Sequence, residues 1–230
     1  MVYKPRWIDQ IFPATCLLCG MAARTGLDAC EGCIADLPLN GRACPRCAMP
    51  LPAGDICGHC LQHPPLASET FCAFHYGWPV RELLLRFKTG GELATGRMLA
   101  EVMARRIDTL GLIPSGGWAL VPVPLARHRT GERGFNQAER IARVLGGRLG
   151  LAVSPRLARR VRRSPDQKGL SARERQRNLE GAFTAADCVG QRLIIVDDVL
   201  TTGATTGALA RCLVDAGALD IKVWCLARAV

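Results

Sequence analysis

The sequence predicts an α/β protein in which a mostly parallel sheet follows a small cysteine-rich domain. Three observations support this. Strand-like apolar segments alternate with amphipathic helical segments beyond residue 66, four CxxC pairs lie before residue 61, and an apolar strand near the C-terminus leads into two carboxylates and a turn of small residues. Strands that alternate with helices are typical of a parallel sheet covered by helices on both faces.

The elements of the sheet domain follow from their hydrophobic patterns. Strands are predicted at 71–76, 118–123, 193–198 and 221–226, and helices at 80–87, 93–110, 135–149 and 208–216. Apolar residues recur along the helices at intervals of three and four. The run Leu193-Ile194-Ile195-Val196 is apolar on both sides, as in the centre of a parallel sheet.

The cysteines predict metal binding. Eight of them form the four CxxC pairs: Cys16/Cys19, Cys30/Cys33, Cys44/Cys47 and Cys57/Cys60. A CxxC turn directs two thiolates at one ion, and two such turns complete a tetrahedral Zn²⁺ site. We therefore expect two structural zinc ions, with the first pair joined to the second and the third to the fourth as the simplest pairing. His59 and His63 are alternative ligands, and a redox dithiol is the weaker alternative reading of the pairs.

The chain divides at a linker. His63-Pro64-Pro65 is followed by the first predicted strand, so we expect a double zinc ribbon over residues 1–66 and the sheet domain over 67–230. The ribbon has little apolar periodicity, and its folding should depend on metal.

The positive charge is concentrated in one stretch. The net charge is +10, and residues 127–177 alone carry 15 Lys and Arg against 4 Asp and Glu. Such a stretch suits pyrophosphate or nucleic acid, or it is a solvated arm. No apolar run reaches the roughly 18 residues of a membrane span, and the N-terminus lacks the apolar core of a signal peptide, so we expect a cytoplasmic protein.

The most specific motif is LIIVDDVLTTGAT at residues 193–205. Ligands of parallel α/β sheets bind beyond the carboxyl ends of the strands. The turn Thr201-Thr202-Gly203-Ala204-Thr205 lets main-chain N–H groups close on a phosphate at a helix N-terminus. The adjacent carboxylates of Asp197 and Asp198 suit the two cis-hydroxyls of a ribose. The motif therefore predicts a 5-phosphoribosyl site.

Two other readings of this motif are weaker. The first is an ordinary surface Asp pair. Adjacent carboxylates repel each other, and this reading offers no gain in return for that repulsion. A nucleotide triphosphatase would also place Asp after an apolar strand, but the chain contains no GxxxxGK[ST] sequence.

The motif resembles the signature of the type I phosphoribosyltransferases, which bind phosphoribosyl pyrophosphate (PRPP). Further segments narrow the resemblance: WALVPVPL (118–125), RGFNQA (133–138), SPDQKGLSARERQRNLEGAF (164–183) and the terminal CLARAV (225–230). With the CxxC pairs, this order is similar to the ComF family of competence-associated proteins over essentially the whole chain. The resemblance implies a type I phosphoribosyltransferase fold preceded by a double zinc ribbon.

The resemblance also implies roles for individual residues. Asp197 and Asp198 would fill the catalytic position and orient the ribose, residues 201–205 would hold its 5-phosphate, and residues 123–125 would lie at the pyrophosphate. Cations for the phosphates would come from Arg129, Arg133 and Lys168, with Mg²⁺ accompanying PRPP. Thr201 stands where purine-salvage members carry an Asp, which argues against a 6-oxopurine acceptor.

Three functional hypotheses follow. The first is a ComF-like protein that binds PRPP or a related ribose phosphate and handles imported single-stranded DNA during natural transformation. It would act with a helicase-like ATPase partner at the cytoplasmic side of the inner membrane. The second is an active phosphoribosyltransferase (a glycosyltransferase) whose acceptor the sequence does not indicate. The third is a zinc-ribbon adaptor with a vestigial transferase domain.

Overall fold

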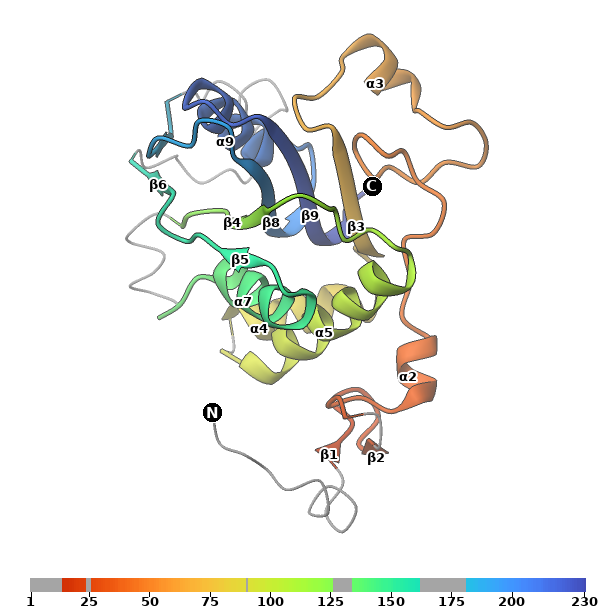
Figure 1. Ribbon diagram of the computed structural model, residues 1–230. Coiled ribbons are helices and arrows are strands. Elements are labelled where there is room, and N and C mark those ends of the chain that lie inside the picture. The colour runs from red at the N-terminus through yellow and green to blue at the C-terminus, as the bar shows by residue number, and fades with distance from the viewer. Residues whose placement is uncertain (1–13, 24–25, 90, 126–133, 162–180) are drawn as a thin grey trace.

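A five-stranded sheet forms the centre of the computed structural model, which describes residues 14–23, 26–89, 91–125, 134–161 and 181–230. The strand order is β3-β9-β8-β4-β5, and every neighbouring pair is parallel (Figure 1). The strands are β3 (Glu69–His75), β4 (Trp118–Pro122), β5 (Ala152–Val153), β8 (Arg192–Leu200) and β9 (Asp220–Arg228). The expected mostly parallel sheet is confirmed.

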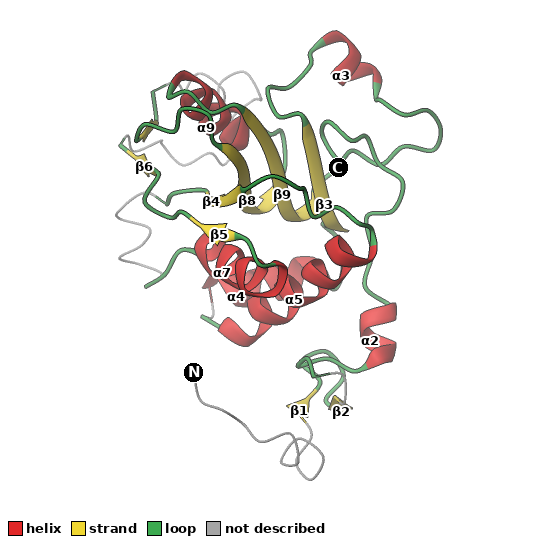
Figure 2. Ribbon diagram, viewed as in Figure 1, coloured by secondary structure: helices red, strands yellow, loops and turns green. Residues whose placement is uncertain are grey.

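Helices cover both faces of this sheet (Figure 2). They are α4 (Val80–Thr89), α5 (Leu93–Thr109), α7 (Gln137–Leu149) and α9 (Ala204–Asp215). α4, α5 and α7 lie together on one face and α9 lies on the other (Figure 1). Because apolar side chains alternate along the central strand, Ile194 and Val196 belong to the core under α4 and α5, whereas Leu193 and Ile195 belong to the core under α9.

The remaining described elements are short. They are β1 (Ala14–Thr15), β2 (Ala22–Ala23), α2 (Glu31–Ala35), α3 (Gly58–Gln62), β6 (Ala158–Arg160) and β7 (Phe183–Ala185). β1 pairs with β2 and β6 pairs with β7, both antiparallel. These pairs and the two-residue β5 are too short for a hydrophobic period to reveal them in the sequence.

The last strand–turn–helix unit differs in its boundaries from the sequence prediction. β8 does not end at the two carboxylates but continues to Leu200, because Val199 and Leu200 still pair with β9. α9 begins at Ala204 rather than 208, since Gly203 adopts a left-handed φ of 77° and the Thr206 hydroxyl donates a hydrogen bond to its carbonyl. The sequence pattern missed both boundaries because partly exposed residues, Asp197 to Val199 in the strand and Gly203 to Thr205 at the helix start, interrupt the run of buried apolar residues.

The cysteine-rich region packs on the helices and on the edge of the sheet. Leu27, Ala29 and Leu37 join the core under α4 and α5. Farther along, the main chain at Pro38 and Asn40 bonds to the edge strand β3 through His75 N to Pro38 O (2.8 Å) and Asn40 N to Ala73 O (3.0 Å). This segment covers a sheet edge that would otherwise expose unpaired main-chain groups. In the described part of the chain, no helix is both long and apolar enough to cross a bilayer.

Candidate functional site

The two predicted carboxylates lie near the carboxyl end of the central strand β8. Asp197 aligns with Cys225 of β9, and the strand ends three residues later at Leu200. Successive strand residues point to opposite faces, so Asp198 lies on the side of the sheet covered by α4 and Asp197 on the side covered by α9. A ligand at this end of β8 would meet one carboxylate on each side of the strand.

The environment of Asp197 opposes its ionisation. Burial and the neighbouring charge of Asp198 raise the pKa of Asp197 from 3.8 to about 7. The Asp198 N–H, which donates to Asp197 Oδ1 at 2.9 Å, and the more distant charges of Lys88 and Arg160 act in the opposite direction. A carboxylate whose pKa is raised by burial and by a second carboxylate is typical of functional sites, because placing the two charges together opposes stability.

Lys88 completes this charge cluster, and the sequence analysis missed it. Its Nζ lies 2.8 Å from Asp198 Oδ2, and the lysine and aspartate side chains are only 23% and 15% exposed. Lys88 lies in the last turn of α4, 110 positions before its partner. In the sequence it reads as an ordinary helix-terminal lysine, and only the packing of α4 against the sheet brings it to Asp198.

The predicted phosphate turn is short and tight. Thr201 and Thr202 are exposed, and Gly203 leads directly into α9. The Ala204 N–H donates to Thr202 Oγ1 at 3.4 Å, and the other N–H groups of the first helical turn have no partner within the helix. They lie at the positive end of the α9 dipole, and phosphate is the ligand that such a turn suits.

The loop after β4 reaches the same edge of the sheet. The Val123 N–H donates to the carbonyl of Val196, the residue before Asp197, at 2.9 Å. Asn136 from the RGFNQA segment donates through Nδ2 to the Val123 carbonyl (3.0 Å) and accepts the Glu139 N–H as the N-cap of α7. This asparagine therefore fixes the loop at the predicted pyrophosphate position. The predicted cations Arg129, Arg133 and Lys168 lie outside the described residues.

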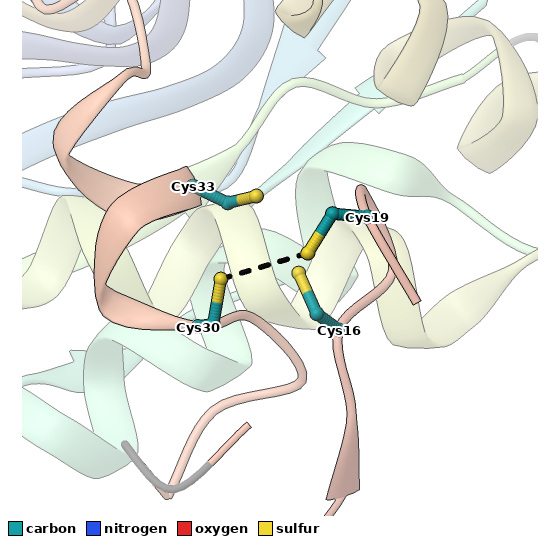
Figure 3. A group of neighbouring side chains, drawn as sticks. All are labelled: Cys16, Cys19, Cys30 and Cys33. Carbon is teal, nitrogen blue, oxygen red and sulfur yellow. Dashed lines mark hydrogen bonds between the residues drawn. The ribbon is translucent and has the colours of Figure 1, made fainter. Parts of the chain in front are cut away.

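The eight cysteines gather into two tetrads, with the expected sequential pairing. Cys16, Cys19, Cys30 and Cys33 form one, and Cys44, Cys47, Cys57 and Cys60 form the other, with the sulfurs of each within 4.8 Å of one another. The sulfurs of the first tetrad point toward a common centre (Figure 3). Cys19 and Cys30 Sγ are 3.7 Å apart, and Cys47 and Cys57 Sγ are 3.6 Å apart. A ZnS₄ tetrahedron with bonds of about 2.3 Å has sulfur–sulfur edges of about 3.8 Å.

Main-chain donors prepare the tetrads for metal. Burial alone would raise the pKa of Cys44, but N–H groups of Cys57, Arg46 and Cys47 lower it to about 7. The pKa of Cys16 falls to about 6 in the same way, through N–H groups that include Cys19 and Cys30. Each tetrad therefore holds one thiol that ionises readily. All four ligands are cysteine, so the sites leave no position for a catalytic water and are structural.

Known proteins resemble this chain along most of its length. Residues 7–61 match the family model of the double zinc ribbon domain. The DNA utilization protein YhgH of Salmonella typhimurium is 36% identical over 224 residues, which cover 94% of this chain and 97% of that protein. Competence protein F of Haemophilus influenzae is 34% identical over 221 residues, covering 90% and 92%. Competence protein ComFC of Bacillus subtilis is 26% identical over 197 residues, covering 82% and 78%.

Among solved structures, TT1426 from Thermus thermophilus matches 56% of this chain and 72% of its own, with a TM-score of 0.34 and 19% identity. The fold and the two tetrads define the class of protein: a double zinc ribbon joined to an α/β domain with a parallel sheet. More particularly, the identity to its relatives over nearly the full length shows that the chain belongs to the ComF family of competence-associated proteins.

Proposed function

We propose that this chain binds PRPP or a closely related ribose phosphate at the carboxyl end of β8 and uses this site in handling imported single-stranded DNA. One observation carries the proposal. At the carboxyl end of the central strand, a pair of carboxylates is followed by a glycine-containing turn at a helix N-terminus. The turn supplies N–H donors for a 5-phosphate, and the carboxylates supply acceptors for ribose hydroxyls.

Each group would have a distinct task with PRPP bound. Asp197 and Asp198 would accept hydrogen bonds from the ribose hydroxyls, and Lys88, now paired with Asp198, would partly neutralise the site before the anionic ligand arrives. The loop at Val123, held beside β8 by Asn136, would meet the pyrophosphate. The donor set here consists of oxygens, which suits Mg²⁺, and bound with PRPP this ion would neutralise phosphate charge.

The DNA part of the proposal is supported by relatives and by charge. Relatives are named for DNA utilization and for competence, and residues 127–177, with 15 Lys and Arg against 4 Asp and Glu, carry all of the excess positive charge. Within the described residues, a groove of about 400 Å³ between α5 and α7 is lined by Arg97, Arg140 and Arg143 together with Leu93, Ala94 and Val144. Arg97 and Arg143 are ion-paired with Asp28 and Glu139, so the excess charge of residues 127–177 is the stronger support. A phosphate backbone would be attracted to that charge with a strong dependence on salt.

Cellular placement is also part of the proposal. The chain would act in the cytoplasm and reach the inner membrane through a helicase-like ATPase partner rather than through a span of its own.

A second candidate function is transfer of the phosphoribosyl group to an acceptor. The pKa of Asp197, raised to about 7 by burial and Asp198, favours it, because a base that titrates near neutrality is suited to accept the proton of an incoming nucleophile. The bond from ribose C1 to pyrophosphate would break as the bond from C1 to the acceptor forms. Pyrophosphate release that depends on an added acceptor would establish this activity.

The experiment that tests the proposal is a thermal-shift panel on the zinc-loaded protein with PRPP, ribose 5-phosphate and pyrophosphate, each with Mg²⁺, beside salt-dependent binding of a labelled single-stranded oligonucleotide. Stabilisation by PRPP beyond that by pyrophosphate, together with oligonucleotide binding that weakens steeply with salt, is expected. If PRPP does not stabilise the protein, the zinc-ribbon adaptor becomes the better hypothesis. If oligonucleotide binding does not change with salt concentration, the proposed role in DNA binding is contradicted.

A further inference from the structure

Arg228 is a buried arginine that connects one cysteine tetrad with the phosphate turn. It is the last residue of β9 and is 6% exposed. Its Nε donates to the Cys47 carbonyl at 2.9 Å. Its Nη1 donates to the Leu200 carbonyl at 3.0 Å and also contacts the carbonyls of Thr201 and Ala229.

These partners are unusual for a buried arginine. Buried guanidinium groups normally face a carboxylate, which offsets the charge. Among the residues that the structure describes, the hydrogen-bond acceptors of Arg228 are main-chain carbonyls. Its positive charge therefore remains uncompensated by these partners, directly behind the turn in which the proposed phosphate binds.

The two ends of this contact are both functional segments. Cys47 belongs to the second tetrad, and Thr201 is the first residue of the phosphate turn. The tetrad end is held against the sheet, because Thr70 of β3 donates through its N–H to the Pro45 carbonyl (2.6 Å) and through its hydroxyl to the Arg46 carbonyl (2.8 Å). The guanidinium thus connects the second tetrad, through the Cys47 carbonyl, with the start of the phosphate turn, through the carbonyls of Leu200 and Thr201. The main chain of that turn must hold one conformation if its N–H groups are to bind a phosphate.

We infer that Arg228 is a positioning residue for the phosphate turn and that it couples metal binding at the second tetrad to anion binding at the turn. The inference rests on the proposed ribose-phosphate function. With zinc in place, the Cys47 carbonyl holds the guanidinium, which draws the carbonyls of Leu200 and Thr201 inward. Coupling between two sites is reciprocal, so a bound phosphate should also retain zinc in the second tetrad.

The first tetrad is an internal control. It contacts the helices instead, through Arg86 Nη1 to the Leu17 carbonyl (3.3 Å) and an ion pair between Arg97 and Asp28. The matched variants are Arg228→Lys and Arg86→Lys. Each keeps its charge, but lysine lacks the planar fork and does not span two separate acceptors in a fixed geometry.

The test combines Mg²⁺-PRPP titration with cysteine protection. Zinc-loaded protein is exposed to a chelator and iodoacetamide, with and without PRPP, and alkylation of each cysteine is followed by mass spectrometry. We expect PRPP to slow alkylation of Cys47 and Cys57 severalfold and to leave Cys19 and Cys30 unchanged. Arg228→Lys should weaken PRPP binding about tenfold and abolish this protection, whereas Arg86→Lys should do neither.

The outcomes separate this inference from the proposed function. A wild-type protein that does not bind PRPP overturns the proposed function. A wild-type protein that binds PRPP but shows equal or no protection of the two tetrads overturns the coupling alone, even if Arg228→Lys does not fold. PRPP binding by a folded Arg228→Lys protein with wild-type affinity overturns the positioning role.

Discussion

Asp197→Asn should make the ligand-free protein more stable while destroying ribose-phosphate binding. The asparagine keeps an oxygen that accepts the Asp198 N–H, now donated at 2.9 Å, and it removes a charge that burial and Asp198 disfavour. A carboxylate that lowers the stability of the ligand-free protein is explained by a role in binding rather than in folding.

The magnitude follows from the pKa. In the folded protein the pKa of Asp197 is about 7 against an ordinary 3.8, and at about 1.4 kcal/mol per unit the full difference is about 4 kcal/mol. Because the Asp197 side chain is partly exposed to solvent, which screens the charge, we expect about 2 kcal/mol at pH 8, or roughly 4–8 °C in Tm.

The stability difference between the variant and the wild type should depend on pH. The folded state binds the Asp197 proton more tightly than the unfolded state, so the favourable contribution of this proton is complete below pH 3.8 and is lost as pH rises through about 7. Asparagine does not titrate. Its advantage over aspartate should therefore be large at pH 8 and small near pH 4.5.

The assay is thermal unfolding of both proteins at these pH values, with zinc content held equal because bound metal itself raises Tm. Millimolar Mg²⁺-PRPP should raise the Tm of the wild type at pH 8 and leave the variant unchanged. A variant less stable than the wild type at pH 8, or one whose advantage does not change with pH, would refute the reasoning.

Three further predictions concern the same site and the metal. Lys88→Met should raise the pKa of Asp197 further, since it removes a cation that lowers it, and should weaken PRPP binding more at pH 7 than at pH 9 in parallel titrations. Gly203→Ala should lower the free energy of unfolding by about 1–2 kcal/mol, because its φ of 77° disfavours a residue with a side chain, and PRPP should no longer raise its Tm. The control is Gly207→Ala at an exposed position of α9, which should still be stabilised by PRPP. Metal analysis should give two zinc ions per chain, and a strong chelator should lower the Tm; a chain that purifies with one ion or none would contradict the tetrads.

The sequence predicted those parts of the molecule that depend on local pattern. The pairing of the CxxC motifs was predicted correctly, because each CxxC turn directs two thiolates at one ion and the next motif along the chain supplies the other two. The long helices and the central strands were predicted because their buried faces repeat with a clear period.

Long-range packing accounts for what was missed. Lys88 meets Asp198, and Arg228 meets Cys47 across 181 positions, and neither pair has a local signature in the chain. The antiparallel pair of β6 and β7 joins a segment within the basic stretch to one beyond it, and neither three-residue segment has a predicted strand. The roles of Arg129, Arg133 and Lys168, and the division of the chain at residue 66, stay predictions.

The most direct measurement of the central claim is calorimetric titration of the zinc-loaded protein with Mg²⁺-PRPP, beside a variant that carries both Asp197→Asn and Asp198→Asn. The proposed site predicts saturable binding of one PRPP per chain by the wild type and its loss in the double variant at unchanged zinc content. No binding by the wild type, or equal binding by both proteins, would contradict a ribose-phosphate site at the end of β8.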